Sequence, residues 1–164
     1  MCSSRERARP WRLLARGICA LTWWGALSLQ AQAQVVSELA SLGFGAFVAS
    51  GAGSVSIDAQ GQRWSTGQVY LIGQGAAASS ALFAVSGSPY ASYIITLPAN
   101  GTVVLADEQG HTIAVQGFGS SQGGAGVLAG DGRAQFRVGA SLVVAAGQVP
   151  GRYSGSFNIT LDYQ

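Results

Sequence analysis

Eleven residues close to the C-terminus alternate strictly between two kinds of side chain. Every second residue from Tyr153 to Tyr163 is apolar, aromatic or glycine, and serine, asparagine, threonine and aspartate lie between them. Successive side chains of an extended chain point to opposite faces, so the pattern predicts one buried and one solvated face. We therefore expect one long β-strand over residues 151–163, covering one sheet of an antiparallel fold.

Short β-prone runs recur through the rest of the chain and are separated by turns rich in glycine, asparagine and proline. None has the 3.6-residue period of an amphipathic helix. About ten strands at intervals of 8 to 12 residues predict an all-β sandwich or barrel. The expected strands before the last one span residues 36–48, 54–58, 68–72, 81–86, 93–97, 102–105, 111–118, 135–138 and 142–145.

The N-terminus has the three parts of a secretory signal peptide. Five arginines within the first 16 residues precede an apolar run over residues 17–29, and Ala31-Gln32-Ala33 follows as an A-x-A cleavage site. Thirteen apolar residues are too few to cross a bilayer core of ~30 Å as a helix. We expect a cleaved signal peptide over residues 1–33 and one domain over residues 34–164. The domain is then exported through the periplasm to the cell surface or beyond.

Cleavage after Ala33 changes the charge and the cysteine content of the chain. Both cysteines, Cys2 and Cys19, belong to the predicted signal peptide, and residues 34–164 contain four arginines, six carboxylates and no lysine. A net charge of −2 gives no reason to expect nucleic acid or an anionic membrane as partner. The domain must fold without a disulfide, and its sparsely charged surface favours packing against copies of itself.

The motifs that resemble catalytic or metal sites lack the companions that such sites need. Ser121 lies in a G-x-S-x-G sequence, but no helix follows it and the chain has one histidine, His111. Asp107 and Glu108 are neighbours in a predicted turn, and neighbouring side chains of an extended chain face opposite sides. Zinc and calcium sites need ligands at spacings that do not occur here. We expect no enzymatic activity, no catalytic residue, no metal site and no cofactor.

A binding module is the alternative function. Aromatic residues are spread along the chain at Trp64, Tyr70, Tyr90, Tyr93 and Tyr153, and such side chains either fill a core or contact a ligand. In this alternative, a self-complete extracellular sandwich binds a glycan or a protein. Tyr90, Tyr93 or the glycine-rich residues 119–132 would make the contact.

Six short motifs resemble a family of secreted bacterial domains, domain of unknown function family 4402. Its members are regarded as pilin-like β-sandwiches, so the resemblance implies the same fold here. The motifs occur in the family's order over nearly the whole of residues 34–164, and are Leu42-Gly43-Phe44-Gly45, Gly53-Ser54-Val55-Ser56-Ile57, Phe83-Ala84-Val85-Ser86-Gly87, Tyr93-Ile94-Ile95-Thr96-Leu97-Pro98, Val138-Gly139-Ala140-Ser141-Leu142 and Pro150-Gly151-Arg152-Tyr153-Ser154-Gly155-Ser156-Phe157.

A narrower resemblance is to the subunits of chaperone-usher pili. Their last strand has a penultimate tyrosine and a glycine fourteenth from the end, which match Tyr163 and Gly151. The resemblance implies an antiparallel immunoglobulin-like sandwich, with a periplasmic chaperone and related subunits as partners, that adds a strand at an open edge. It assigns assembly roles to Val36, Ala40, Leu42 and Phe44 near the N-terminus, and to Gly151, Tyr153, Phe157, Ile159, Leu161 and Tyr163 in the last strand.

The same resemblance leaves two roles open for residues 34–41. They can be a donor arm for the next subunit, or they can be the first strand of their own domain. The arm is eight residues long and includes Glu38. Pilus subunits of the best-known types also carry a disulfide, which residues 34–164 cannot form.

Overall fold

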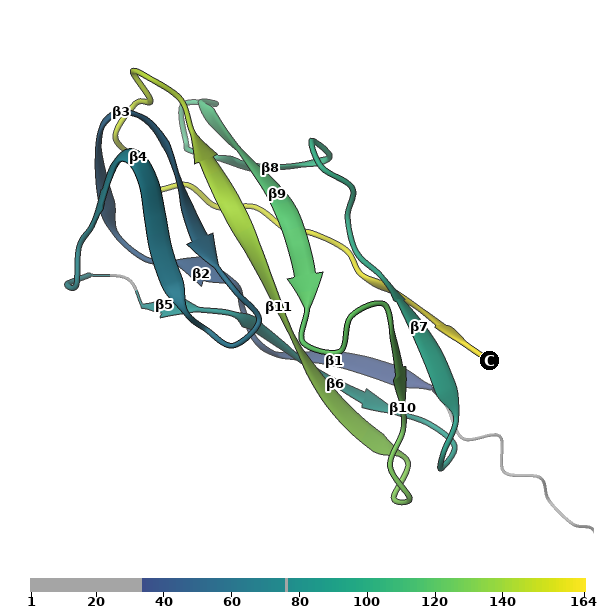
Figure 1. Ribbon diagram of the computed structural model, residues 1–164. Coiled ribbons are helices and arrows are strands. Elements are labelled where there is room, and N and C mark those ends of the chain that lie inside the picture. Colours follow the sequence, from purple (N-terminus) through teal and green to yellow (C-terminus); the bar gives the residue numbers. More distant parts are fainter. Residues whose placement is uncertain (1–33, 76) are drawn as a thin grey trace, which may run out of the picture. The chain divides into compact units, whose positions relative to one another are not determined.

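The computed structural model describes residues 34–75 and 77–164, so the predicted signal peptide lies outside the described residues. The described residues form β-strands and no helix, and every strand pairing is antiparallel (Figure 1), which confirms the predicted all-β fold. The strands are β1 (Val35–Ala40), β2 (Gly43–Phe44), β3 (Phe47–Ile57), β4 (Arg63–Leu71), β5 (Ala78–Ser79), β6 (Ala81–Ser86), β7 (Ser92–Thr96), β8 (Val103–Ala106), β9 (Thr112–Ser120), β10 (Ala125–Val127), β11 (Arg133–Val144) and β12 (Thr160–Tyr163).

The larger sheet is organised around β11, which runs through its middle (Figure 1). The first half of β11 pairs with β6, and its second half lies between β3 and β9. The sheet continues from β6 to β1, from β3 to β4 and from β9 to β8. Strands β1 and β4 therefore end the main path of the sheet, each with one edge free of a strand partner in the described chain.

The smaller sheet has the order β10-β7-β12 and shares a core with β6 and β11. Tyr93 of β7 and Phe136 of β11 are the largest buried side chains of this shared core. Phe83 stacks on Phe136 with ring centroids 5.4 Å apart. A second cluster lies between β3, β4, β8, β9 and β11. Because side chains from both sheets bury one another in the first cluster, the fold is sandwich-like.

The β3–β4 hairpin turns a sharp corner. Three residues of β3, 50–52, bulge opposite the single residue Gln68 of β4, and Gly67 next to it has a φ of +68°, which favours glycine. Arg63 pairs with β3 at the turn end of the hairpin, yet its guanidinium donates hydrogen bonds to the carbonyls of Ala46 and Ile72 at the other end. The hairpin is therefore folded back on itself, as the curve of β3 in Figure 1 shows.

The prediction of one continuous strand over residues 151–163 is wrong. Only Ser154, which bridges to Ala106 beside β8, and β12, which pairs with β7, are in ladders. The segment passes from the larger sheet to the smaller one, so neither sheet can pair with it throughout. The predicted alternation persists: polar members are exposed, while Tyr153, Phe157, Ile159, Leu161 and Tyr163 are half-buried.

The expected first strand over residues 36–48 is also wrong, because the chain forms β1, β2 and the start of β3 there. Gly45 has a φ of +68°, a left-handed conformation that interrupts an extended chain.

Candidate assembly site

The N-terminal strand β1 lies at the edge of the larger sheet and buries little. Its residues pair with β6 of the same chain, from Val35 opposite Ser86 to Ala40 opposite Leu82. Val35, Val36 and Leu39 are 51%, 40% and 54% exposed, although they are apolar. The resemblance to pilus subunits leaves two possible roles for residues 34–41, and in the structure they contain the first strand of their own domain.

The four N-terminal residues with predicted assembly roles fall into two groups. Val36 and Ala40 lie in β1, at the surface or half-buried. Phe44 is buried in the core cluster with Val55 and Val69, and Leu42 packs against both core clusters. Leu42 and Phe44 therefore hold the chain to its own core, whereas β1 before them is paired with β6 and buries little side-chain surface.

Phe157 joins the two core clusters from the C-terminal segment. Its ring lies 5.1 Å from that of Phe118 and 6.3 Å from that of Phe83, measured between centroids. Ile159, Leu161 and Tyr163 pack on the cluster between the sheets, where the Tyr163 ring lies 6.1 Å from that of Tyr93. Burial raises the pKa of both phenols. The apolar side chains of the C-terminal segment therefore pack on the core although the segment is not paired as one continuous strand.

The backbone of residues 155–159 forms an open edge. In the described chain, none of these five residues makes a backbone hydrogen bond to another part of the chain. Strand β12 that follows pairs with β7 on one side only. Unpaired N–H and C=O groups beside an anchored apolar face are a template for an added strand. We call residues 155–159 the open segment.

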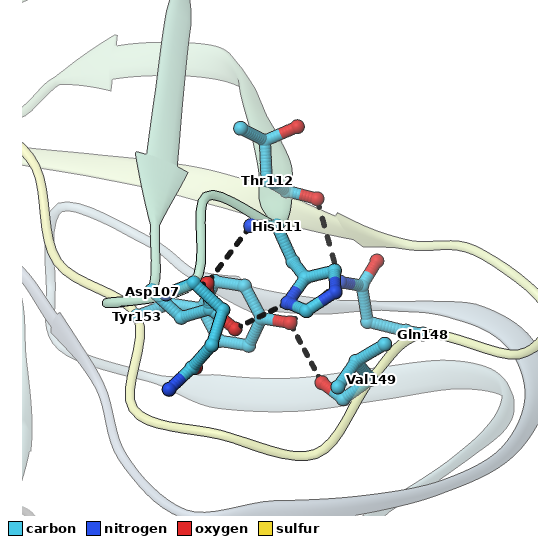
Figure 2. Close-up of polar contacts among 7 residues, drawn as sticks. Asp107, His111, Thr112, Gln148, Val149 and Tyr153 are labelled. Carbon is cyan, nitrogen blue, oxygen red and sulfur yellow. Dashed lines mark hydrogen bonds and ion pairs between the residues drawn. The ribbon is translucent and has the colours of Figure 1, made fainter.

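Gly151 lies beside a turn that Asp107 organises. A Cβ at Gly151 would lie 3.5 Å from Asp107 Oδ2, so the glycine lies close to the carboxylate. Asp107 Oδ1 accepts hydrogen bonds from the backbone N–H groups of Gln109 and His111, and Oδ2 lies 2.7 Å from His111 Nδ1. Figure 2 shows this pair close to Tyr153, whose hydroxyl donates to Val149 O and accepts from Gln148.

The Asp107 carboxylate should make the fold sensitive to acid. Its side chain is 3% exposed, and this desolvation raises its pKa, but the hydrogen bonds from His111 and Gln109 outweigh it and the pKa lies below the usual value. The unfolded chain then binds more protons than the folded chain. The contribution is present above about pH 3.9 and is lost as the pH falls through the folded-state pKa.

Urea unfolding at a series of pH values checks this prediction. We expect the wild-type free energy of unfolding to decline more steeply than that of Asp107→Asn as the pH falls below about 4. Parallel profiles for the two proteins would mean that Asp107 does not contribute to the acid sensitivity.

Alanine substitutions at two glycines near the C-terminus, Gly151 and Gly155, should change the free energy of unfolding by different amounts. At Gly155 a Cβ would lie 2.7 Å from the carbonyl oxygen of Val104, so the backbone must shift, at a cost of about 1–3 kcal/mol. At Gly151 the nearest atom to a Cβ is 3.5 Å away, and the free energy of unfolding should change by less than about 0.5 kcal/mol. Thermal unfolding of both variants measures the difference. Gly151→Ala is therefore a probe of assembly that leaves the domain intact.

Ser121 and His111 have separate hydrogen-bond partners. Ser121 Oγ accepts a hydrogen bond from the backbone N–H of Arg137, whereas His111 contacts Asp107. Among residues 34–75 and 77–164, no group of three potential metal ligands gathers. No helix of those residues is long and apolar enough to cross a membrane.

The binding residues of the alternative function are divided by the structure. Tyr93 is fully buried and its hydroxyl donates to Gln122 Oε1 at 2.6 Å, so the expectation that it contacts a ligand is wrong. Tyr90, Tyr70 and Trp64 are 75%, 62% and 46% exposed. Residues 119–132 include the end of β9 and all of β10 rather than one free loop.

These features define an antiparallel, sandwich-like β-domain whose C-terminal segment has an open backbone edge. The chain belongs to the family described as domain of unknown function DUF4402, whose model matches residues 34–163. No curated protein and no solved structure shows a significant match to the chain.

Proposed function

We propose that this protein is a secreted, non-enzymatic structural protein that assembles through β-strand pairing. In this proposal it is a pilin-like subunit or an adhesion domain of the cell surface. The signal peptide exports it to the periplasm, where a chaperone binds it, and it then packs against copies of itself or related subunits. It uses no cofactor.

The open segment carries this proposal. Its Phe157 and Ile159 side chains already pack on the core, so a strand added beside it gains backbone hydrogen bonds without refolding the domain. Extended peptides bind to exposed sheet edges in this way, with main-chain hydrogen bonds giving affinity. Long exposed edges otherwise lead to uncontrolled aggregation, which favours a partner that covers this one.

Strand β1 supports the proposal from the other end of the chain. Three exposed apolar side chains on one edge strand are costly for a free domain and become useful when a neighbour covers them. The absence of a disulfide and the low charge of residues 34–164 agree with a subunit that is stabilised by its neighbours.

A charge placed in the open segment tests the proposal. Asn158 is exposed and lies within the segment, so Asn158→Lys should weaken strand addition and leave the melting temperature of the domain unchanged. Gln60→Lys, in the exposed β3–β4 turn, adds the same charge away from the segment. Light scattering and negative-stain electron microscopy of the chain from Gln34 compare the three proteins.

We expect the wild type and Gln60→Lys to form oligomers or filaments and Asn158→Lys to remain smaller. A wild type that stays monomeric, and whose melting temperature does not rise with a synthetic peptide of residues 34–48, would overturn strand-pairing assembly. Oligomers of equal size in all three proteins would place the contact elsewhere.

A further inference from the structure

One outward face of the larger sheet carries two ordered rows of side chains. Trp64 of β4 lies opposite Ser56 of β3, Ser56 opposite Ser141 of β11, and Ser141 opposite Gln116 of β9. The alternate residues of these central strands, Val55, Leu142 and Val115, are buried, so the row points away from the core. Four strands at ~4.8 Å spacing make the row roughly 14 Å long.

The second row is parallel to the first. It consists of Thr66, Ser54, Val143, Ala114 and Val104 on β4, β3, β11, β9 and β8. The hydroxyls of Ser54 and Thr66 lie 2.8 Å apart, as do those of Ser56 and Ser141. Hydroxyls thus gather over β3 and its neighbours, while the far end of the second row is aliphatic and ends on Val104, which is 50% exposed.

Neither row contains a charged residue. The exposed members are the Trp64 indole, Thr66, the Gln116 amide and Val104. Ser54, Ser141, Val143 and Ala114 are half-buried, and Ser56 is buried. Trp64 is 46% exposed, and β4 has a free edge beside it, so a ligand can extend beyond the sheet. We define the two rows together as the Trp64 face.

We propose that the Trp64 face binds a neutral oligosaccharide. A pyranose ring has an apolar C–H face that stacks on an indole and hydroxyls that exchange hydrogen bonds with serine, threonine and glutamine side chains. The lack of charge on the face matches the lack of charge on such a sugar. A second copy of the chain fits less well, because the centre of a stable protein interface is more apolar than these hydroxyl rows.

The Trp64 face meets the open segment at β8, where Gly155 lies close to the Val104 carbonyl. Trp64, Thr66 and Gln116 lie on β4 and β9, away from that contact. A structural subunit with this face would also be an adhesive one. Loss of sugar binding and loss of assembly can therefore be measured separately.

Intrinsic fluorescence tests the proposal directly, because Trp64 is the only tryptophan of residues 34–164. Both core clusters lie within those residues, so the chain from Gln34 is the protein to use. It is titrated with maltohexaose, cellohexaose and mannohexaose, and with a polygalacturonate hexamer as the charged comparison. Retention on gels that carry the same sugars gives a second readout.

We expect a saturable change of Trp64 emission with at least one neutral hexamer and a much weaker response to the charged one. Retention of the Trp64→Ala variant on the sugar gels should fall at least about tenfold. The Gln116→Ala variant should fold normally and be retained more weakly than the wild type. Tyr90→Ala removes an even more exposed aromatic side chain outside the Trp64 face and should bind as the wild type does.

Three results would overturn the proposal. One is no response to any neutral hexamer, and another is Trp64→Ala retained as well as the wild type. The third is an emission change that follows protein concentration without sugar, which would mean that a second copy covers the face. If the protein assembles but binds no sugar, the proposal for the Trp64 face is overturned and strand-pairing assembly is not.

Discussion

Replacing Phe136 with alanine is expected to lower the free energy of unfolding by about 3–5 kcal/mol. Phe136 is 1% exposed, stacks on Phe83 and lies in the first half of β11, between the two sheets. The cavity left by the ring cannot collapse easily, because β11 is paired along its length. Urea unfolding of the chain from Gln34 measures the loss.

Phe157→Ala is the matched comparison for this prediction. Phe157 contacts two aromatic rings but is half-buried at the open segment, so its truncation should cost about 2 kcal/mol. Equal losses for the two variants would mean that the C-terminal segment is as deeply packed as the centre of the sandwich.

Gly139→Ala is expected to cost about 3 kcal/mol through steric conflict rather than a cavity. A Cβ at Gly139 would collide with backbone atoms of Ile57, Asp58 and Ala59, where β3 enters its turn, and none of these can move as a side chain end can. Gly119 is the cross-strand partner of Gly139, yet a Cβ there would meet nothing within 4 Å.

Gly119→Ala is therefore the control, with an expected change of less than about 0.5 kcal/mol. Thermal unfolding of the two variants side by side checks the prediction. A small effect of Gly139→Ala would show that the β3 turn can move away from β11.

The alternation over residues 153–163 correctly predicted which side chains face the core. It could not reveal that the segment crosses between two sheets, because side-chain period is a local property and ladder partners are distant in sequence. Strand β4 shows the same limit. Its residues from Arg63 to Gly67 lie outside the predicted strand over residues 68–72, yet the Arg63 guanidinium donates the hydrogen bonds that link the two ends of the folded-back hairpin.

The candidate assembly site was predictable only in part. The resemblance to chaperone-usher subunits singled out Gly151 and Tyr163, but no sequence signal distinguishes the unpaired open segment from β12, since both continue one pattern. The alternative function offered Tyr93 as one possible ligand contact, and it lies in the core, because an aromatic residue in a short strand fits either place. The Trp64 face depends on cross-strand register, which composition and spacing do not give.

Amide hydrogen exchange of residues 155–159, in monomeric and assembled protein, tests strand-pairing assembly most directly. Amides without a hydrogen-bond partner exchange fast, and those in a ladder are protected. We expect fast exchange of these five amides in the monomer and strong protection in the assembly, with the exchange of β4 unchanged. An assembly in which residues 155–159 still exchange as fast as in the monomer would overturn strand-pairing assembly through the open segment.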